Sequence, residues 1–208
     1  MRRLISFAEA EKELQLCDSY TRLRTLLLLT FKMHESSFYR LLGEYWCTFD
    51  NTSSQLEMLA DLLLWKTPVE KMMTHKERRL LAALPDRITI YRGCGKKNIR
   101  GISWTLNRRL AEAFPFFGRF RVERPLLVAA SVDKRDVAAL KIERNEDEII
   151  CSPWQILSIE PISPERGEES AQQWRSSILR PRRDHKRMSR ILIQPCCPPS
   201  EETQAGAP

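Results

Sequence analysis

The spacing of apolar residues in the first 85 positions predicts a series of α-helices. Leucine and aromatic residues recur every three or four positions in four stretches, at 14–27, 38–46, 56–63 and 80–84. Polar segments at 50–54 and 66–68 separate some of these stretches. The apolar stripes are most simply explained as core-facing surfaces. We therefore expect a helical amino-terminal extension over residues 1–85.

Residues 86–164 show a different pattern, in which short β-branched, aromatic or apolar runs alternate with turns. These runs predict strands at 87–91, 101–105 and 125–132, and a further strand that begins at Glu148. A helix is predicted at 106–114, with Thr105 or Asn107 as its cap and Pro115 near its end. Helices that precede and interrupt the strands indicate an α+β fold.

The end of the first predicted strand places an arginine where it could bind a phosphate. Gly93 and Gly95 are expected to stop this strand, so Arg92 would be held by a rigid backbone. Its planar guanidinium can form paired hydrogen bonds to a phosphate, which a lysine does not reproduce in geometry. Ser103 and Thr105 fall on one face of the next strand by its two-residue period, and two hydroxyls suit a ribose.

Acidic residues precede the last predicted strand. If Glu148 is the first inward residue of that strand, it faces the same cleft as Arg92 and Ser103, with Glu146 two residues back on the same side. A buried carboxylate can stabilise the positive charge that develops on a sugar when its bond to nicotinamide breaks. A second carboxylate can hold or deprotonate the nucleophile, which typically contributes about 10²–10⁴-fold. This combination is typical of an NAD-consuming site.

Taken in order, these segments resemble the motifs of the arginine-serine-glutamate class of ADP-ribosyltransferases, which includes bacterial toxins and many phage or prophage proteins. The resemblance covers roughly residues 86–162, with Tyr91-Arg92-Gly93, Ser103-Trp104-Thr105 and Glu146-x-Glu148-Ile149-Ile150 as its motifs. It implies a split, mixed β-sandwich of two small sheets, with NAD in the cleft between them. The second motif is usually Ser-Thr-Ser or similar, so Trp104 is a departure. The short interval between the first two motifs implies a compact core.

The resemblance also assigns roles to individual residues. Arg92 would bind the phosphate or the nicotinamide ribose of NAD, and Glu148 would be the catalytic glutamate. Glu146 would be the acceptor-side glutamate of arginine-modifying members, and Ser103 would organise the strand and the ribose contacts. The residues expected to bind NAD are Arg92, Tyr91, Gly93, Ser103, Trp104, Thr105, Phe114 and Phe117.

Phe114 and Phe117 belong to an aromatic group that follows the predicted helix and also includes Phe116 and Phe120. A flat aromatic cation such as nicotinamide favours an aromatic face, so these rings could stack on it. Aromatic residues after a helix also commonly fill a core. The sequence leaves both interpretations open.

The expected reaction transfers ADP-ribose from NAD to a macromolecule and releases nicotinamide. A protein arginine is the first expected acceptor because Glu146 precedes Glu148 by two positions, and the net charge of +7 keeps nucleic acid open as an acceptor. An inhibitory antitoxin is a further expected kind of partner. Three alternatives remain: an NAD glycohydrolase that uses water as acceptor, a catalytically inactive protein of this fold that binds a partner, and a plain nucleic-acid-binding protein.

Residues 165–208 predict a basic, partly disordered carboxy-terminal tail. A helix is expected through Leu179, followed by a basic run at 180–190 and a disordered end at 195–208. The basic run suits a polyanionic partner or a solvated tail. No zinc-finger, RRM or helix-turn-helix signature indicates base-specific binding.

The cysteines and the amino terminus predict a cytoplasmic protein without a metal site or a membrane partner. The six cysteines are scattered without metal-ligand spacing and favour a reducing compartment. The first residues lack the apolar core of a signal peptide, and the longest apolar run is far too short to span a bilayer. Export by a route without a cleaved signal stays open.

Overall fold

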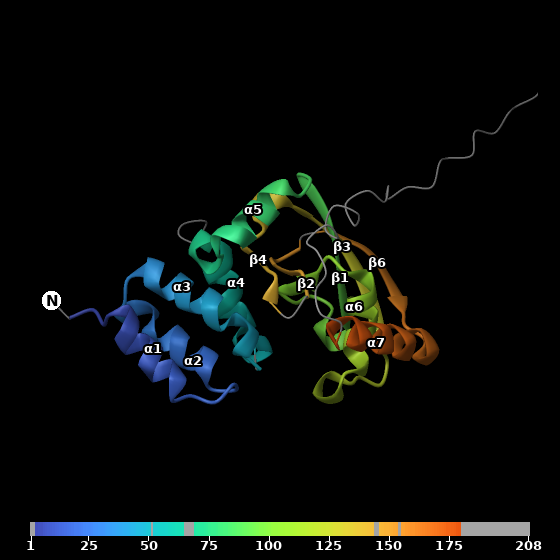
Figure 1. Ribbon diagram of the computed structural model, residues 1–208, viewed down its shortest axis with the longest axis horizontal. Coiled ribbons are helices and arrows are strands. Elements are labelled where there is room, and N and C mark those ends of the chain that lie inside the picture. The colour runs from blue at the N-terminus through green and yellow to red at the C-terminus, as the bar shows by residue number, and fades with distance from the viewer. Residues whose placement is uncertain (1–2, 51, 65–68, 144–145, 154, 180–208) are drawn as a thin grey trace, which may run out of the picture.

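The computed structural model describes residues 3–50, 52–64, 69–143, 146–153 and 155–179. The chain has the expected α+β composition, with a series of helices before a six-stranded antiparallel sheet. Figure 1 shows α1 to α4 beside one end of the sheet and α6 and α7 toward the other end. The basic run and the expected disordered end lie outside the described residues.

The first 85 residues form helices where the apolar periodicity predicts them. They are α1 (Phe7–Gln15), α2 (Arg22–Leu29), α3 (Glu35–Tyr45), α4 (Leu56–Leu64) and α5 (His75–Ala83), with the 3₁₀ turns η1 (Thr30–Lys32), η2 (Trp46–Thr48), η3 (Thr52–Gln55) and η4 (Val69–Met72). Capping boxes of Ser6 with Glu9 and of Thr74 with Glu77 begin α1 and α5. Leu16 does not join the core but is 83% exposed, because it follows the last residue of α1.

A shared core joins these helices to the sheet. Leu14, Leu26 and Leu41 of the helices are fully buried in the same apolar cluster as Ile90 and Val128 of the strands. Burying such side chains contributes about 1.5–3 kcal/mol each, so the contact between helices and sheet is a major part of the stability. The helical extension therefore shares one apolar core with the strands that carry the predicted site.

The structure has the four predicted strands with corrected ends, and two further strands, β4 and β6, that were not predicted. The strands are β1 (Arg87–Cys94), β2 (Ser103–Thr105), β3 (Leu126–Asp133), β4 (Ala139–Lys141), β5 (Glu148–Ile150) and β6 (Gln155–Pro161), arranged as β4-β5-β2-β1-β3-β6. Gly93 does not stop β1, because pairing with β3 continues to Cys94 opposite Leu126. The glycine has a packing reason instead, since a Cβ at this position would collide with the carbonyl oxygen of Ala111.

The other face of the sheet is covered by elements that follow β2. They are α6 (Arg108–Ala113), η6 (Phe114–Phe116), η7 (Gly118–Phe120) and α7 (Pro164–Leu179), while η5 (Lys96–Asn98) and η8 (Lys134–Asp136) connect strands. Asn107, one of the two predicted caps, accepts a hydrogen bond from the Leu110 amide at 3.2 Å. A small apolar cluster of Ala111, Leu127 and Ile162 lies beneath these helices.

The junction in the middle of the sheet is narrow. In the described residues β1 pairs with β2 at Tyr91 and Thr105 alone, whereas β1 pairs with β3 along its whole length. The sheet thus consists of two three-stranded parts, β4-β5-β2 and β1-β3-β6, that separate beyond this pair. Hydrogen bonds still join the strands into one sheet rather than the two separate sheets that the resemblance implies. Arg92 and Ser103 lie where the two parts separate.

None of the described helices is both long and apolar enough to cross a membrane. In the described part of the chain, Cys17, Cys47, Cys94 and Cys151 form no disulfide bond. Among all the residues that the structure describes, no group of histidine, cysteine or acidic side chains could hold a metal ion.

Candidate functional site

Glu148 is the first residue of β5, as predicted, and its side chain is 9% exposed. Thr105 pairs with Glu148, and Ser103 pairs with Ile150, so these side chains share one face of the sheet. The Ser103 hydroxyl donates a hydrogen bond to Oε1 of Glu148 at 2.5 Å. The structure therefore brings together the serine and the glutamate of the second and third motifs.

Trp46 supplies a second donor to the same carboxylate oxygen. Its indole Nε1 lies 2.9 Å from Oε1 of Glu148, although the two residues are 102 positions apart. Trp46 begins η2, directly after α3, and its ring is 4% exposed and lies edge-on to Phe49. The helical extension thus contributes a side chain to the site.

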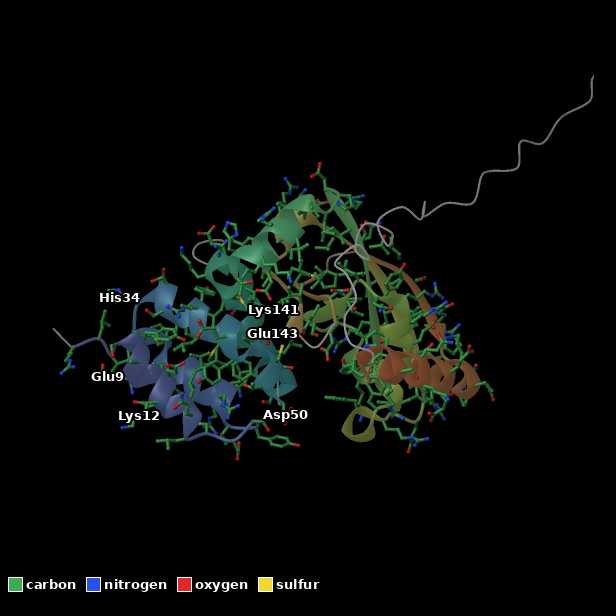
Figure 2. The ribbon with its side chains drawn as sticks, viewed as in Figure 1. Glu9, Lys12, His34, Asp50, Lys141 and Glu143 are labelled. Atoms are coloured by element: carbon green, nitrogen blue, oxygen red, sulfur yellow. The ribbon has the colours of Figure 1, made fainter. Side chains whose placement is uncertain are left out.

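A buried ion pair lies beside the carboxylate. Lys141 of β4 is the cross-strand partner of Glu148, and its ammonium is 3.2 Å from Oε2 of Glu77 and 3.3 Å from the Met72 carbonyl oxygen. Figure 2 shows Lys141 and Glu143 where the amino-terminal helices meet the sheet. The charge of Lys141 is therefore largely satisfied by Glu77, which comes from α5.

Burial raises the pKa of Glu148 above its usual value of 4.5, because a charged carboxylate is costly away from water. The hydrogen bonds from Ser103 and Trp46 lower the pKa and so reduce this effect. The positive charges of Arg92 and Lys141 act in the same direction but more weakly. The net result is a carboxyl group that retains its proton to higher pH than an exposed glutamate.

Arg92 lies at the point where β1 and β2 separate. Its guanidinium donates to the carbonyl oxygen of Ser103, and also to Asn98 through Nε to the main-chain oxygen at 3.1 Å and Nη2 to Oδ1 at 2.7 Å. These bonds use three of the five N–H groups of an arginine. The guanidinium also passes so close to Gly101 that a Cβ there would meet its Nη2 at 2.5 Å. The first and second motifs are thus in direct contact.

Burial lowers the pKa of Arg92, and the neighbouring Cys94 thiol and Glu148 carboxyl act against this change. The pKa of Cys94 is raised by burial and partly lowered by the charge of Arg92. An arginine keeps its charge under such conditions because its ordinary pKa is above 12. The site therefore combines a fixed positive charge with a titratable carboxyl group.

Glu146 is not on the strand that carries Glu148, so the prediction from two-residue alternation was made on the wrong geometry. β5 begins only at Glu148, and Asp147 between the two glutamates has a left-handed backbone with φ of 44°. Glu146 is held from its main chain, since its carbonyl oxygen accepts a hydrogen bond from the Thr105 hydroxyl at 2.6 Å. Glu146 itself is partly exposed and lies two residues before the start of β5.

The remaining residues of the first two motifs have packing roles in the structure. Tyr91 packs against the small cluster beneath α6, and Gly93 lets α6 approach β1. Trp104 is 2% exposed and donates from its indole nitrogen to the Gly101 carbonyl oxygen at 2.6 Å. The NAD contacts expected for these residues stay predictions.

Phe114 and Phe117 form an aromatic cluster with neighbouring rings. Phe114 stacks on Phe120 with ring centres 4.7 Å apart, and Phe117 lies 5.0 Å from Trp174 of α7. Arg175 also lies over the Phe117 ring, with 5.7 Å to its centre. These contacts fasten α7 to the segment after α6 and agree with the packing interpretation that the sequence left open.

Comparisons with models of known protein families, with curated proteins and with solved structures found no match. The site therefore rests on its own geometry. That geometry joins Arg92, Ser103 and Glu148, adds Trp46 and Asn98, and ties the main chain of Glu146 to Thr105.

Proposed function

We propose that the protein is a mono-ADP-ribosyltransferase that moves ADP-ribose from NAD to a macromolecular acceptor. One observation carries the proposal: Ser103 bonds Glu148 through its hydroxyl and Arg92 through its carbonyl oxygen, at the split between the two halves of the sheet. An arginine, a hydroxyl and a buried carboxyl group are the residues that this chemistry requires. In the sheet, the strands that carry the three motifs, β1, β2 and β5, are neighbours in the same order as the motifs in the sequence.

The donor groups suit NAD as the substrate. The permanent charge of Arg92 favours a phosphate or the adjoining ribose, and N–H groups beyond its three bonds remain for the Cys94 thiol or a ligand. Glu148 would lie against the nicotinamide ribose. Nicotinamide in NAD is positively charged, so its approach would favour the ionised form of a carboxyl group whose pKa burial has raised.

Glu148 would act by stabilising positive charge on the ribose as the bond between ribose and nicotinamide breaks. The electron pair of this bond leaves with nicotinamide, which becomes neutral. The acceptor nitrogen then bonds to the same ribose carbon and gives up a proton. Glu146, at the margin of the site and partly exposed, would take this proton.

A protein arginine is the acceptor that we propose first. Glu146 is an acidic side chain at the margin of the site, where it could bind an incoming guanidinium. Transfer to nucleic acid and transfer to water are the competing outcomes, and each leaves a different product. An inactive protein of the same fold would yield none of these products.

The test is incubation of purified protein with labelled NAD and a cell lysate divided into protein and nucleic-acid fractions. We expect nicotinamide release and label in the protein fraction, with both lost in Glu148→Gln. Glu143→Gln is the matched control, because Glu143 is 48% exposed and contacts Lys141 rather than Glu148. Glu146→Gln should reduce labelling more than nicotinamide release.

Each other result has a distinct meaning for the proposal. Label in the nucleic-acid fraction would change the acceptor, and nicotinamide release without label would indicate an NAD glycohydrolase. Wild-type protein that neither binds NAD nor releases nicotinamide would refute the proposed activity.

A further inference from the structure

Both hydrogen bonds that Glu148 receives go to one of its two carboxylate oxygens. Ser103 Oγ and Trp46 Nε1 donate to Oε1, at 2.5 and 2.9 Å. Within the part of the chain that the structure describes, Oε2 accepts no hydrogen bond. The two oxygens of this buried group are therefore different: Oε1 accepts both hydrogen bonds, and Oε2 accepts none from the described residues.

The donor from Trp46 is fixed more rigidly than the donor from Ser103. A serine hydroxyl can rotate to another acceptor, whereas an indole N–H points in one direction set by the ring. The Trp46 ring is 4% exposed and lies edge-on to Phe49 with ring centres 6.3 Å apart. The ring position is in turn set by the core that α3 shares with the sheet.

We propose that Trp46 is a positioning residue for Glu148, whose indole N–H holds Oε1 so that Oε2 is the oxygen presented to the sugar. This inference rests on the proposed function for the identity of the sugar, but the orientation of Glu148 can be measured without activity. The helical extension is then part of the site, because it supplies the group that fixes the carboxylate.

The charged groups that act on Glu148 come from two strands, Arg92 of β1 and Lys141 of β4. Lys141 is itself paired with Glu77 of α5, and none of the charged groups acting on Glu148 comes from α3 or η2. Trp46 affects the carboxyl group through a neutral N–H donor. Loss of this N–H should therefore change Glu148 while leaving the charges around it in place.

The experiment compares Trp46→Phe, which keeps an aromatic ring but removes the N–H, with Tyr39→Phe. Tyr39→Phe is the matched control, because Tyr39 is 4% exposed, lies on α3 and donates a partly buried hydrogen bond to the Leu62 carbonyl oxygen that the variant loses. The pKa of Glu148 is read from its carboxyl carbon by NMR, with Glu148→Gln to assign the signal. Nicotinamide release is measured over the same pH range.

We expect Trp46→Phe to raise the pKa of Glu148 by about one to two units, because a hydrogen bond to a charged group contributes about that much. The acid limb of kcat/KM for NAD should move by the same amount, and Tyr39→Phe should leave both unchanged. An unchanged pKa in Trp46→Phe, or an equal shift in Tyr39→Phe, would overturn the inference. A shifted pKa in a protein that never releases nicotinamide would refute the activity and keep the positioning role.

If Trp46→Phe does not fold, benzothienylalanine at position 46 gives the same test. It retains the shape of the indole and replaces its N–H by sulfur. The expected pKa shift and the contradicting result are unchanged.

Discussion

Lys141 and Glu77 form an ion pair at 3.2 Å in which the two side chains are only 2% and 1% exposed. Glu77 also accepts hydrogen bonds from the Thr74 and Ile142 amides. The Glu77 carboxylate thus caps the start of helix α5, accepts a hydrogen bond from Ile142 directly after β4, and neutralises the Lys141 ammonium next to Glu148. The helical extension and the sheet depend on each other at this point.

Glu77→Gln should destabilise the protein by about 3–5 kcal/mol, because it leaves the Lys141 ammonium buried without its counter-charge. Urea unfolding at neutral pH measures this change. Glu143→Gln removes an exposed carboxylate 3.9 Å from the same ammonium and should cost less than about 1 kcal/mol. Similar losses in the two variants would mean that burial of the pair does not determine its contribution.

Burial alone would raise the pKa of Glu77, but the hydrogen bonds from Thr74 and Ile142 and the charge of Lys141 together outweigh it, so the pKa is lowered. A carboxyl group with a lowered pKa stabilises the folded state above its ordinary pKa, and this contribution is lost as pH falls through the folded value. The wild-type protein should therefore lose stability relative to Glu77→Gln in acid, below about pH 4.5. A stability difference between the two proteins that stays constant with pH would contradict this.

The contribution of Glu148 to the stability of the folded state should change with pH in the opposite direction to that of Glu77. The pKa of Glu148 is raised by burial, so between its usual value of 4.5 and the raised value the folded state binds more protons than the unfolded chain. Stability therefore falls as pH rises through this window, by about 1.4 kcal/mol for each unit of raised pKa. Thermal unfolding should show that the Tm of Glu148→Gln rises relative to that of the wild type as the pH increases above about 4.5. An equal pH dependence of Tm in both proteins would show that Glu148 titrates normally.

The same raised pKa predicts the pH dependence of activity. If ionised Glu148 stabilises the ribose, kcat/KM for NAD should increase with pH up to a midpoint above 4.5, the usual glutamate value. Nicotinamide release at saturating and at low NAD would measure the midpoint in the complex and in the free protein. The midpoint in the complex should be lower, because the positive nicotinamide favours the ionised carboxylate. An activity that is independent of pH down to about 4 would assign the role to another group.

Gly101→Ala should weaken NAD binding by about tenfold or more while leaving the fold intact, because the added methyl group displaces the guanidinium of Arg92 from Ser103. A factor of ten corresponds to about 1.4 kcal/mol, within the range for one hydrogen bond to a charged group. Gly118→Ala is the control, since a Cβ there meets no atom within 4 Å. Calorimetric titration with NAD compares the two variants, and equal affinities would exclude Arg92 as an NAD ligand.

Much of the fold could be predicted from the sequence because local patterns determined it. The helices of the first 85 residues and the strands at Arg87 and Leu126 follow their apolar periodicity closely. β6 was not predicted, since Leu157 and Ile159 are about half exposed and the segment lacks a clear alternation. Its pairing with β3 is a tertiary interaction that overrides the weak local signal.

The site was predicted in part, for a related reason. Arg92, Ser103 and Glu148 each lie at a strand position, and the order of the strands brings them together. Strand alternation does not extend to Glu146, because β5 begins at Glu148 and Asp147 has a left-handed backbone, and the role expected for Glu146 stays a prediction. Trp46 was missed, although a buried indole generally needs an acceptor for its N–H, because the sequence does not say which acceptor lies 102 residues away.

The dependence of β4 and β5 on the helical layer determines how the chain could be divided. A fragment that starts at Asp86 would keep Lys141 and Glu148 but lose Glu77 and Trp46, their partners in the intact chain. In such a fragment Lys141 would keep only the exposed Glu143 as a counter-charge, Glu148 would keep only the Ser103 donor, and the apolar residues of the strands that pack against the helices would be uncovered. Recombining it with residues 1–85 should restore both partners, so the strands and the helical extension should work as two complementary pieces, whereas the strands alone should not.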